Sequence, residues 1–539
     1  MGSSVSGSDY DVVILGGGLA GGCLARQFRL ESPEIRIAVV EKRQHPVREA
    51  AFKVGESSVE IGAHYFQKRL GLESHLREGH LEKLGLRYFF TRGGNSELTT
   101  RFELGPPSFP PVPSFQLDRG RLENHLLASE RDAGVDIFDG TRVEKLELSA
   151  DVHRVTIRRG SDSRTVEAPW VVDASGRAGL IKRQLGLARP SPHGANACWF
   201  RVKSRVKLDD WSTDAAWRRR VPSDQRWMST NHLMGPGYWV WLIPLGSGST
   251  SLGIVADGDM HPYHRLNRFD RAMEWLREFE PQFAAMMDAG PGELQDFLAL
   301  QHFAHGCARV FSPDRWALVG EAGVFTDPFY SPGSDFIAMS NDYAKDLIVR
   351  SLGGEDVGAR TESFNTTYLR VFDAFTRLYD GQYPIMGNAR VMTAKVAWDN
   401  ACYWSITALL FFQRRLTRPE YMDSIDPLMR RFFVLHARMQ RFLRGWHLAD
   451  AAEYPATASN VVSVECLREL QAGLGDPWID DDALTARLTV NLDRLEAFAR
   501  TWQHIALAQH PGLDRMFGQD GPLLPETTTL LPEPVAVAQ

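Results

Sequence analysis

Residues 10–23 read YDVVILGGGLAGGC, and this stretch decides the fold. Its apolar run ends at Leu15, where a glycine-rich turn opens an apolar helical pattern that continues through Leu24 and Phe28. A second apolar run covers residues 35–40. Strand, glycine-rich turn, helix and strand in this order predict a βαβ unit.

The glycine-rich turn carries the spacing GxGxxG, formed by Gly16, Gly18 and Gly21. The first glycine permits the tight turn, the second lets a pyrophosphate approach the backbone, and the third lets the helix pack on the strand. The phosphate then lies at the helix N-terminus, near Ala20, where N–H groups and the helix dipole favour an anion. Glu41 ends the second strand, 20 residues after Gly21, and is the acid expected on a ribose 2′-hydroxyl.

Two later segments distinguish FAD from NAD as the dinucleotide. Residues 171–177 (VVDASGR) and 316–328 (WALVGEAGVFTDP) each place a turn-rich segment after an apolar strand. Both resemble motifs of the glutathione-reductase-like FAD fold that aromatic hydroxylases and halogenases use. The resemblance implies that Glu321 contacts the ribityl chain of the flavin, although the family usually has an aspartate there. The residues that this motif adds to the expected cofactor site are Gly320, Glu321, Asp327 and Pro328.

A further segment, residues 116–122 (QLDRGRL), resembles the one that puts an arginine near the flavin. Arg119 is therefore expected to contact the cofactor; the alternative is a surface arginine at the start of a helix. No second GxGxxG follows in the chain. This favours a separate NAD(P)H-dependent flavin reductase as the source of FADH2.

Residues 239–244 (WVWLIP) match WxWxIP, a signature of flavin-dependent halogenases. Trp239 and Trp241 alternate along a strand, so both indoles point to the same side. The resemblance implies that they form, with Ile243 and Pro244, a wall that holds the substrate away from the flavin. The alternative is a tryptophan-rich core strand.

Residues 325–333 (FTDPFYSPG) resemble FxxPxxSxG, a second signature of the same family, beside the flavin ring. Backbone N–H groups at the start of the helix that follows are expected to bind a halide ion; the alternative is a turn that only seats the flavin. Asp335 would repel a halide, so we expect it to cap the helix and point away. The four residues expected at the halide are Ser331, Pro332, Gly333 and Ser334.

Residues 54–57 (VGES) resemble a halogenase segment that a single lysine follows, lining the tunnel for hypohalous acid (HOX). Lys83, 27 residues after Glu56, fits this position best, and Lys53 is a second candidate. A protonated amine hydrogen-bonds HOX and polarises it, whereas a deprotonated amine forms a haloamine. The alternative is a solvated surface lysine.

The resemblance to the flavin-dependent halogenases, a tryptophan-halogenase-like family, covers residues 9–345. It implies an enzyme that uses FADH2, O2 and chloride or bromide to halogenate an electron-rich aromatic (a phenol, pyrrole or indole), free or tethered to a carrier protein. Two alternatives stay open. One is an FAD-dependent aromatic monooxygenase or dehydrogenase of the same fold, which Glu321 and Asp335 favour. The other is a flavin-binding scaffold without catalysis.

The expected fold is α/β: a glutathione-reductase-like FAD-binding fold with an inserted α+β substrate region and an all-helical C-terminal region. We expect a flexible tail over residues 1–9 and an FAD-binding domain over 10–355, with the insertion at about 80–310. A helical domain over 356–520 and a disordered tail over 521–539 would complete the chain.

Composition excludes several other classes. The 539 residues carry a net charge of −6, which leaves no broad basic surface for nucleic acid. None of the five cysteines forms a CxxC pair, so neither a metal site nor a disulfide framework is expected. The N-terminus lacks the features of a signal peptide, and residues 403–412 have about half the length of a membrane span. These observations predict a cytoplasmic protein with no transmembrane segment.

Overall fold

The chain forms two compact units, each built from three stretches of sequence. The computed structural model describes residues 8–50, 53–221, 224–450, 456–460 and 465–513. The first unit comprises Met1–Leu81, Leu117–Ser191 and Ala304–Phe372, and the second comprises Glu82–Gln116, Pro192–Phe303 and Asp373–Gln539. Residues 117–191, which fall within the predicted insertion, therefore belong to the first unit. The tail predicted at 521–539 and nearly all of that at 1–9 lie outside the described residues.

The first unit is built on a six-stranded sheet in the order β19-β20-β11-β1-β2-β7. All its strand pairs are parallel except β19 with β20. Helix α1 (Leu19–Glu31) connects β1 to β2, so the predicted βαβ unit is confirmed. Every residue of β1 is buried, as is typical of a parallel sheet covered on both faces. The six strands are β1 (Val12–Leu15), β2 (Ile37–Val40), β7 (Asp136–Phe138), β11 (Trp170–Asp173), β19 (Phe311–Ser312) and β20 (Trp316–Leu318).

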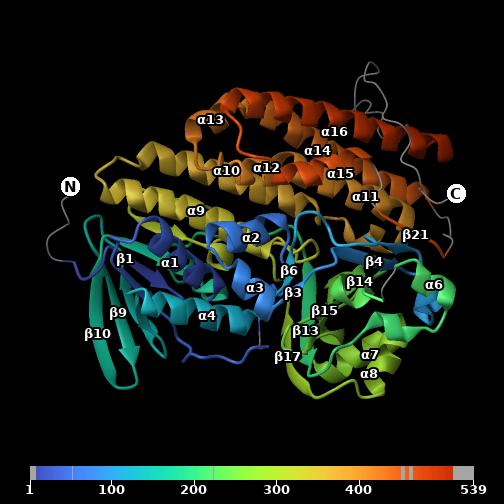
Figure 1. Cartoon of the computed structure of the whole chain (residues 1–539), viewed down its shortest axis with the longest axis horizontal. Coiled ribbons are helices and arrows are strands. Elements are labelled where there is room, and N and C mark those ends of the chain that lie inside the picture. Colours follow the sequence, from blue (N-terminus) through green and yellow to red (C-terminus); the bar gives the residue numbers. More distant parts are fainter. Residues whose placement is uncertain (1–7, 51–52, 222–223, 451–455, 461–464, 514–539) are drawn as a thin grey trace. The chain divides into compact units, whose positions relative to one another are not determined.

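The helices of the first unit bring its distant segments to the glycine-rich turn. Helix α1 packs against α4 and α9, and α9 also packs against α2 (Figure 1). A separate antiparallel sheet of β8 (Arg142–Glu147), β9 (His153–Arg159) and β10 (Asp162–Ala168) precedes β11. The helices are α2 (Glu60–His64), α3 (Glu73–Gly79), α4 (Arg119–Asp132), α5 (Leu180–Gln184), α9 (Gly333–Leu352) and most of α10 (Gly358–Arg377).

The second unit contains an eight-stranded sheet in the order β17-β13-β16-β15-β14-β4-β5-β21. Strands β15 and β16 pair in antiparallel fashion. One face of this sheet packs on α7 (Phe269–Phe279) and α8 (Pro281–Asp288) in a hydrophobic core. The strands are β4 (Leu86–Phe90), β5 (Glu103–Leu104), β13 (Ala195–Val202), β14 (Thr230–Gly235), β15 (Tyr238–Pro244), β16 (Thr250–Asp257), β17 (Leu294–Leu300) and β21 (Ala458–Ser459).

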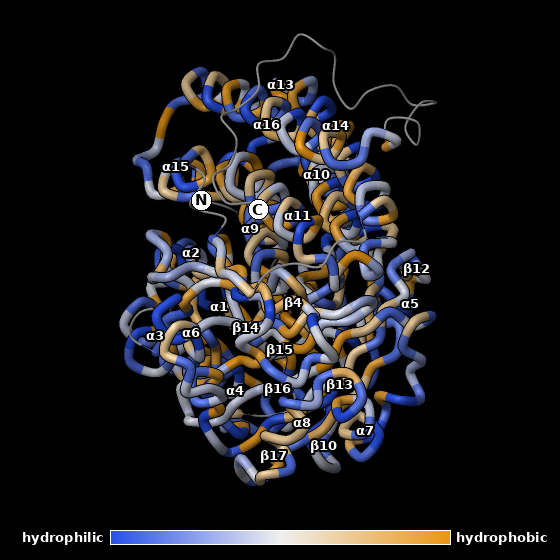
Figure 2. The backbone as a smooth tube through the Cα atoms, turned by 90° about the vertical axis from the view of Figure 1, so that its right-hand side faces the viewer, coloured by the Kyte–Doolittle hydropathy of each residue, from blue (hydrophilic) through white to orange (hydrophobic). Residues whose placement is uncertain are grey.

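The C-terminal part of the second unit is mostly helical, as the sequence predicts. Helices α11, α14 and α16 pack on one another, and their tubes alternate between apolar and polar residues in Figure 2. Among the helices that the structure describes, none combines the length and the apolar character that crossing a bilayer requires. The helices are α11 (Ala389–Cys402), α12 (Leu409–Phe412), α13 (Pro419–Ser424), α14 (Asp426–Ala449), α15 (Glu465–Ala472) and α16 (Asp481–Gln509), with a π-helical turn at Tyr403–Ala408.

The expectation of an all-helical C-terminal region is wrong at one point. Strand β21 lies within it and pairs in parallel with β5. The N–H of Glu103 donates to Thr457 O (2.9 Å), and the N–H of Gly105 donates to Ser459 O (2.9 Å). The physical reason is that an exposed sheet edge needs partners for its backbone groups, and a helical pattern in the sequence does not show this need.

Candidate functional site

Two of the three motif glycines in the glycine-rich turn are needed by the fold itself, whereas the third is needed only to leave room for a ligand. A Cβ on Gly16, whose φ is +120°, would lie 2.4 Å from Ala174 O. A Cβ on Gly21 would lie 1.9 Å from Gly16 O. By contrast, a Cβ on Gly18 would meet nothing within 4 Å, and Gly18 gives helix α1 no side-chain cap. This open approach to an uncapped helix N-terminus fits the pyrophosphate of FAD.

Glu41 lies at this turn, where the sequence predicts it. The N–H of Gly17 donates to Glu41 Oε2 (2.7 Å), and the N–H of Arg43 donates to Oε1 (2.8 Å). Both carboxylate oxygens are thereby oriented at the end of β2, although the side chain is buried. This position agrees with a ribose contact, which stays a prediction.

The other two FAD segments meet beside the same turn. A Cβ on Gly320, whose φ is +56°, would lie 3.1 Å from the Cβ of Ala20. Glu321 pairs with Arg177 (3.1 Å), so residues 171–177 and 316–328 are in contact. Burial raises the pKa of Glu321, and the Arg177 guanidinium opposes that shift. Asp327 is fully buried, and its Oδ1 accepts a hydrogen bond from the N–H of Phe329 (2.9 Å).

Arg119 begins helix α4 and is half-buried. Its guanidinium donates to Val54 O (2.7 Å) and to Glu123 Oε1 (2.8 Å), so it ties the VGE segment to α4. Lys53 also pairs with Glu123, and burial lowers the pKa of Lys53 to about 7. Lys53 and Arg119 thus share one buried carboxylate in the first unit.

The four residues expected at the halide are not equivalent. Ser331 adopts a φ of +58°, and its N–H donates to Pro328 O (2.8 Å). Pro332 has no N–H and therefore offers no backbone donor. Within the described chain, the N–H groups of Gly333 and Ser334 in the first turn of α9 have no backbone partner. The Ser334 hydroxyl is buried, has no hydrogen-bond partner among the residues that the structure describes, and lies beside Gly62.

Asp335 caps a helix, but not its own. Its Oδ1 accepts a hydrogen bond from the N–H of Gly62 (2.8 Å) in the first turn of α2, and α9 has no side-chain cap. The reason is tertiary: α2 packs against α9, and its N-terminus lies within reach of this carboxylate. The carboxylate is therefore engaged with a positive helix end.

Lys83 belongs to the second unit and is only 1% exposed, so the alternative of a solvated surface lysine is wrong. The backbone N–H of Lys83 donates to Ser114 O (2.8 Å), and the backbone N–H of Leu84 donates to Met228 O (3.1 Å). The main chain around Lys83 is therefore held from two sides, just before β4.

The two tryptophans of WxWxIP are held in place by hydrogen bonds on one face of β15. Trp241 Nε1 donates to Ser251 Oγ (3.2 Å), and its ring lies over Gly253, where a Cβ would come within 2.2 Å. Trp239 Nε1 donates to Tyr383 Oη (3.0 Å). Each tryptophan is 2% exposed. The buried residues Ile243 and Pro244 continue the strand.

Sequence reasoning missed three residues that shape this wall: Gly253, Tyr383 and His232. Gly253 had a signal, because an isolated glycine within a strand marks a close approach by another group. Tyr383 and His232 had none, since their positions depend on pairing with segments far away in the chain.

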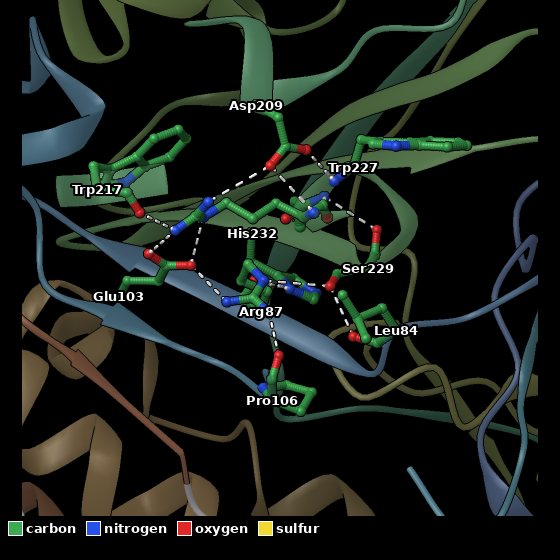
Figure 3. A network of polar contacts seen from close by, with 11 residues as sticks. Leu84, Arg87, Glu103, Pro106, Asp209, Trp217, Trp227, Ser229 and His232 are labelled. Carbon is green, nitrogen blue, oxygen red and sulfur yellow. Dashed lines mark hydrogen bonds and ion pairs between the residues drawn. The ribbon is translucent and has the colours of Figure 1, made fainter. Parts of the chain in front are cut away.

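A buried ion network supports the sheet edge beside Lys83 (Figure 3). Glu103 accepts from Arg87 (2.5 Å) and Arg226 (2.9 Å), and all three side chains are at most 1% exposed. Arg87 Nε donates to Ser229 Oγ (3.3 Å), and the Ser229 hydroxyl donates to Leu84 O (2.7 Å). The network thereby reaches the residue that follows Lys83.

Replacing Glu103 with glutamine is expected to lower the free energy of unfolding by about 3–5 kcal/mol, because the two buried guanidinium groups lose the carboxylate charge that both of them contact. Glu144→Gln is the matched control, since Glu144 forms an exposed pair with Arg158. That variant should unfold almost like the wild type. Urea unfolding of both variants measures the difference, and equal midpoints would contradict the role given to Glu103.

Comparison with known proteins agrees with this geometry. A family model described as an FAD binding domain matches residues 9–249. A flavin-dependent halogenase from Dictyostelium discoideum is 30% identical over 448 residues, covering 77% of this chain and 72% of that protein. A 1H-pyrrole-2-carbonyl-[peptidyl-carrier protein] chlorinase from Pseudomonas fluorescens is 26% identical, covering 65% of this chain and 78% of its own.

Solved structures show the same fold. Halogenase PltM, in a complex with phloroglucinol and FAD, aligns with a TM-score of 0.65 at 15% identity, over 91% of this chain and 97% of that one. The flavin-dependent brominase Bmp2 aligns with a TM-score of 0.54 at 21% identity, over 71% of this chain and 91% of its own.

The fold, the glycine-rich turn and the converging FAD segments define an FAD-dependent oxidoreductase. Within this class, the chain belongs to the flavin-dependent halogenase family. FAD is its cofactor and a halide ion its co-substrate.

Proposed function

We propose that this halogenase uses FADH2, O2 and chloride or bromide to make HOX, and that Lys83 delivers the halogen to an electron-rich aromatic ring. The observation that carries the proposal is the burial of Lys83 in the unit that also holds the WxWxIP tryptophans. Taking an ammonium group out of water is costly, so a buried amine calls for a role beyond solubility. Hydrogen bonding to HOX supplies such a role.

The first unit binds the cofactor and the halide in this proposal. Reduced flavin would supply two electrons to O2 and the halide the other two, which would give HOX, water and oxidised flavin. The N–H groups of Gly333 and Ser334, together with the Ser334 hydroxyl, hold the halide at the start of α9. Arg119, Glu321 and Glu41 orient the cofactor.

The second unit delivers the halogen. The Lys83 ammonium donates a hydrogen bond to the oxygen of HOX, which makes the halogen more electrophilic and lets the oxygen leave as water. Trp239 and Trp241 are the wall that keeps the ring of the substrate in a fixed orientation and apart from the flavin. A separate NAD(P)H-dependent flavin reductase supplies FADH2, because the chain has only one GxGxxG.

Phenols, pyrroles and indoles are the substrate types that fit this chemistry, because each has an electron-rich ring carbon. The relative from Pseudomonas fluorescens is named as a chlorinase of a carrier-bound pyrrole, which supports testing carrier-tethered substrates as well as free ones.

The test incubates the protein with FAD, a flavin reductase, NADH, O2, bromide or chloride, and a panel of phenols, pyrroles and indoles. Mass spectrometry should find a product with the isotope pattern of the added halide, and that product should be absent without halide. A product that gains one oxygen atom whether or not halide is present would instead establish the monooxygenase alternative.

A further inference from the structure

One row of side chains crosses the sheet of the second unit on the face opposite its hydrophobic core. Tyr88 on β4 pairs in register with His232 on β14, His232 pairs with Trp241 on β15, and Trp241 pairs with Gly253 on β16. Paired residues of neighbouring strands point to the same face. His232 is therefore part of the surface that carries the WxWxIP tryptophans, and it is 1% exposed.

The hydrogen bonding of His232 determines which ring nitrogen carries its proton. Nδ1 lies 3.0 Å from Arg87 O, and a carbonyl oxygen only accepts hydrogen bonds. Nδ1 therefore carries the proton of the neutral ring, and Nε2 carries the lone pair. The ring stacks on Tyr88 (4.7 Å between centroids) and lies against Trp239 (5.4 Å), so the direction of Nε2 is set by two aromatic neighbours.

A series of hydrogen bonds connects His232 to Leu84, the residue that follows Lys83. Arg87, whose carbonyl orients His232, donates to Ser229, and Ser229 donates to the carbonyl of Leu84, next to Lys83 (Figure 3). Tyr88, the strand partner of His232, lies only five positions after Lys83 in the chain. A fully extended chain of that length spans about 17 Å, which is an upper limit on the distance between the two backbones.

The remaining ionisable groups around His232 are themselves engaged. Burial and nearby Asp399 raise the pKa of the Tyr88 phenol well above its usual value. Asp399 on α11 forms a buried ion pair with Lys395 (2.9 Å). The Arg87 guanidinium points to the opposite face, where Glu103 neutralises it. The imidazole of His232 is thus the nitrogen base that this face places beside the tryptophans.

We propose that His232 is the base that removes the hydroxyl proton of the substrate, and that the substrate is a phenol with a free hydroxyl group. The inference rests on the proposed function, because it needs HOX as the halogen donor. A phenol has a pKa of about 10, close enough to that of imidazole for the imidazole to accept the hydroxyl proton during the reaction. Pyrrole and indole N–H groups are far weaker acids.

The proposed step balances in atoms and charge. His232 Nε2 takes the hydroxyl proton, and the electron pair of that O–H bond moves into the ring. A ring carbon then forms a bond to the halogen of HOX as the O–X bond breaks, and the departing hydroxide takes a proton from Lys83 to become water. The ring carbon afterwards loses its own proton to solvent, which also reprotonates Lys83, and His232 returns its proton to the oxygen. The sum is a phenol and HOX giving a halophenol and water.

The test compares a phenol with its methyl ether in one tube, so that changes in HOX supply cancel. His232→Asn keeps an N–H donor for Arg87 O and removes the basic nitrogen. We expect the rate with the phenol to fall by about 10²–10⁴-fold, and the rate with the ether to stay unchanged. A phenol acidic enough to be ionised at the assay pH should recover most of the lost rate. Equal losses with phenol and ether, or no loss, would overturn the role of His232.

The pH dependence of the wild-type enzyme is a second test, and it does not depend on how the variant folds. The ratio of halogenated phenol to halogenated ether should fall as the pH is lowered, because a protonated imidazole no longer accepts the hydroxyl proton. A ratio independent of pH would contradict the proposal. If neither substrate is halogenated in any halide, while flavin is still reduced and reoxidised, the proposed function itself fails.

Discussion

We expect Lys83→Met to lower halogenation of the aromatic substrate by about 10²–10⁴-fold, the range for removal of a positioned proton donor. Methionine keeps the length and apolar stem of lysine but has no group that donates to HOX. The residues expected to bind the flavin lie in the other unit, so reoxidation of FADH2 and release of HOX should continue. Mass spectrometry measures the product, and a dissolved HOX scavenger measures the oxidant in the same samples.

Two controls sharpen this result. Lys145→Met removes an exposed lysine and should leave the product yield unchanged. Lys83→Arg keeps a positive charge but replaces the compact ammonium with a planar fork, so it should restore little activity. The role of Lys83 is refuted if Lys83→Met folds, makes HOX and still halogenates at the wild-type rate.

We expect Gly18→Val to give a folded protein that no longer binds FAD. A Cβ at Gly18 meets no atom of the described residues within 4 Å, and its backbone (φ −71°, ψ −170°) suits any residue. The added side chain therefore occupies only the space that a pyrophosphate needs. We expect FAD affinity to fall by at least about 10²-fold, since repulsion and the loss of the phosphate contacts exceed about 2.7 kcal/mol. Fluorescence titration with FAD measures the loss.

Gly21→Ala separates this ligand effect from a folding effect. A Cβ at Gly21 would lie 1.9 Å from Gly16 O, so this variant should lose both its fold and its FAD. Thermal unfolding should show a Tm near that of the wild type for Gly18→Val and a large decrease for Gly21→Ala. A Gly18→Val protein that retains FAD would place the pyrophosphate elsewhere.

The FAD-binding turn could be predicted from the sequence because the spacing of its glycines is local. Gly16, Gly18 and Gly21 lie within six residues, and a Cβ on Gly21 would meet Gly16 O, whereas the contact that restricts Gly16 is with the distant Ala174 O. The pairing of β15 with β16 was likewise predictable, since two alternating runs with a short connection form a hairpin. The family signatures at 239–244 and 325–333 supplied the halogenase interpretation before any contact was known.

The chemistry of single groups was not predictable in the same way. Ser331 loses its N–H to a turn with Pro328, so the candidate halide donors become Gly333 and Ser334. Asp335 caps α2, which precedes it by some 270 residues in the chain. These outcomes depend on backbone geometry and on packing between helices, which a motif does not specify.

The sequence by itself determined the class of fold, the cofactor and the family, because those follow from short motifs whose residues act on their immediate neighbours. The tertiary structure decided which lysine is buried, which N–H groups remain at the start of α9, and which nitrogen of His232 carries a lone pair. The tautomer of His232 depends on Arg87 O, which is far away in the chain, whereas Ser331 loses its N–H to Pro328 in a local turn that the motif does not specify. Burial and hydrogen-bond satisfaction are set by the whole chain, so only its packing reveals them.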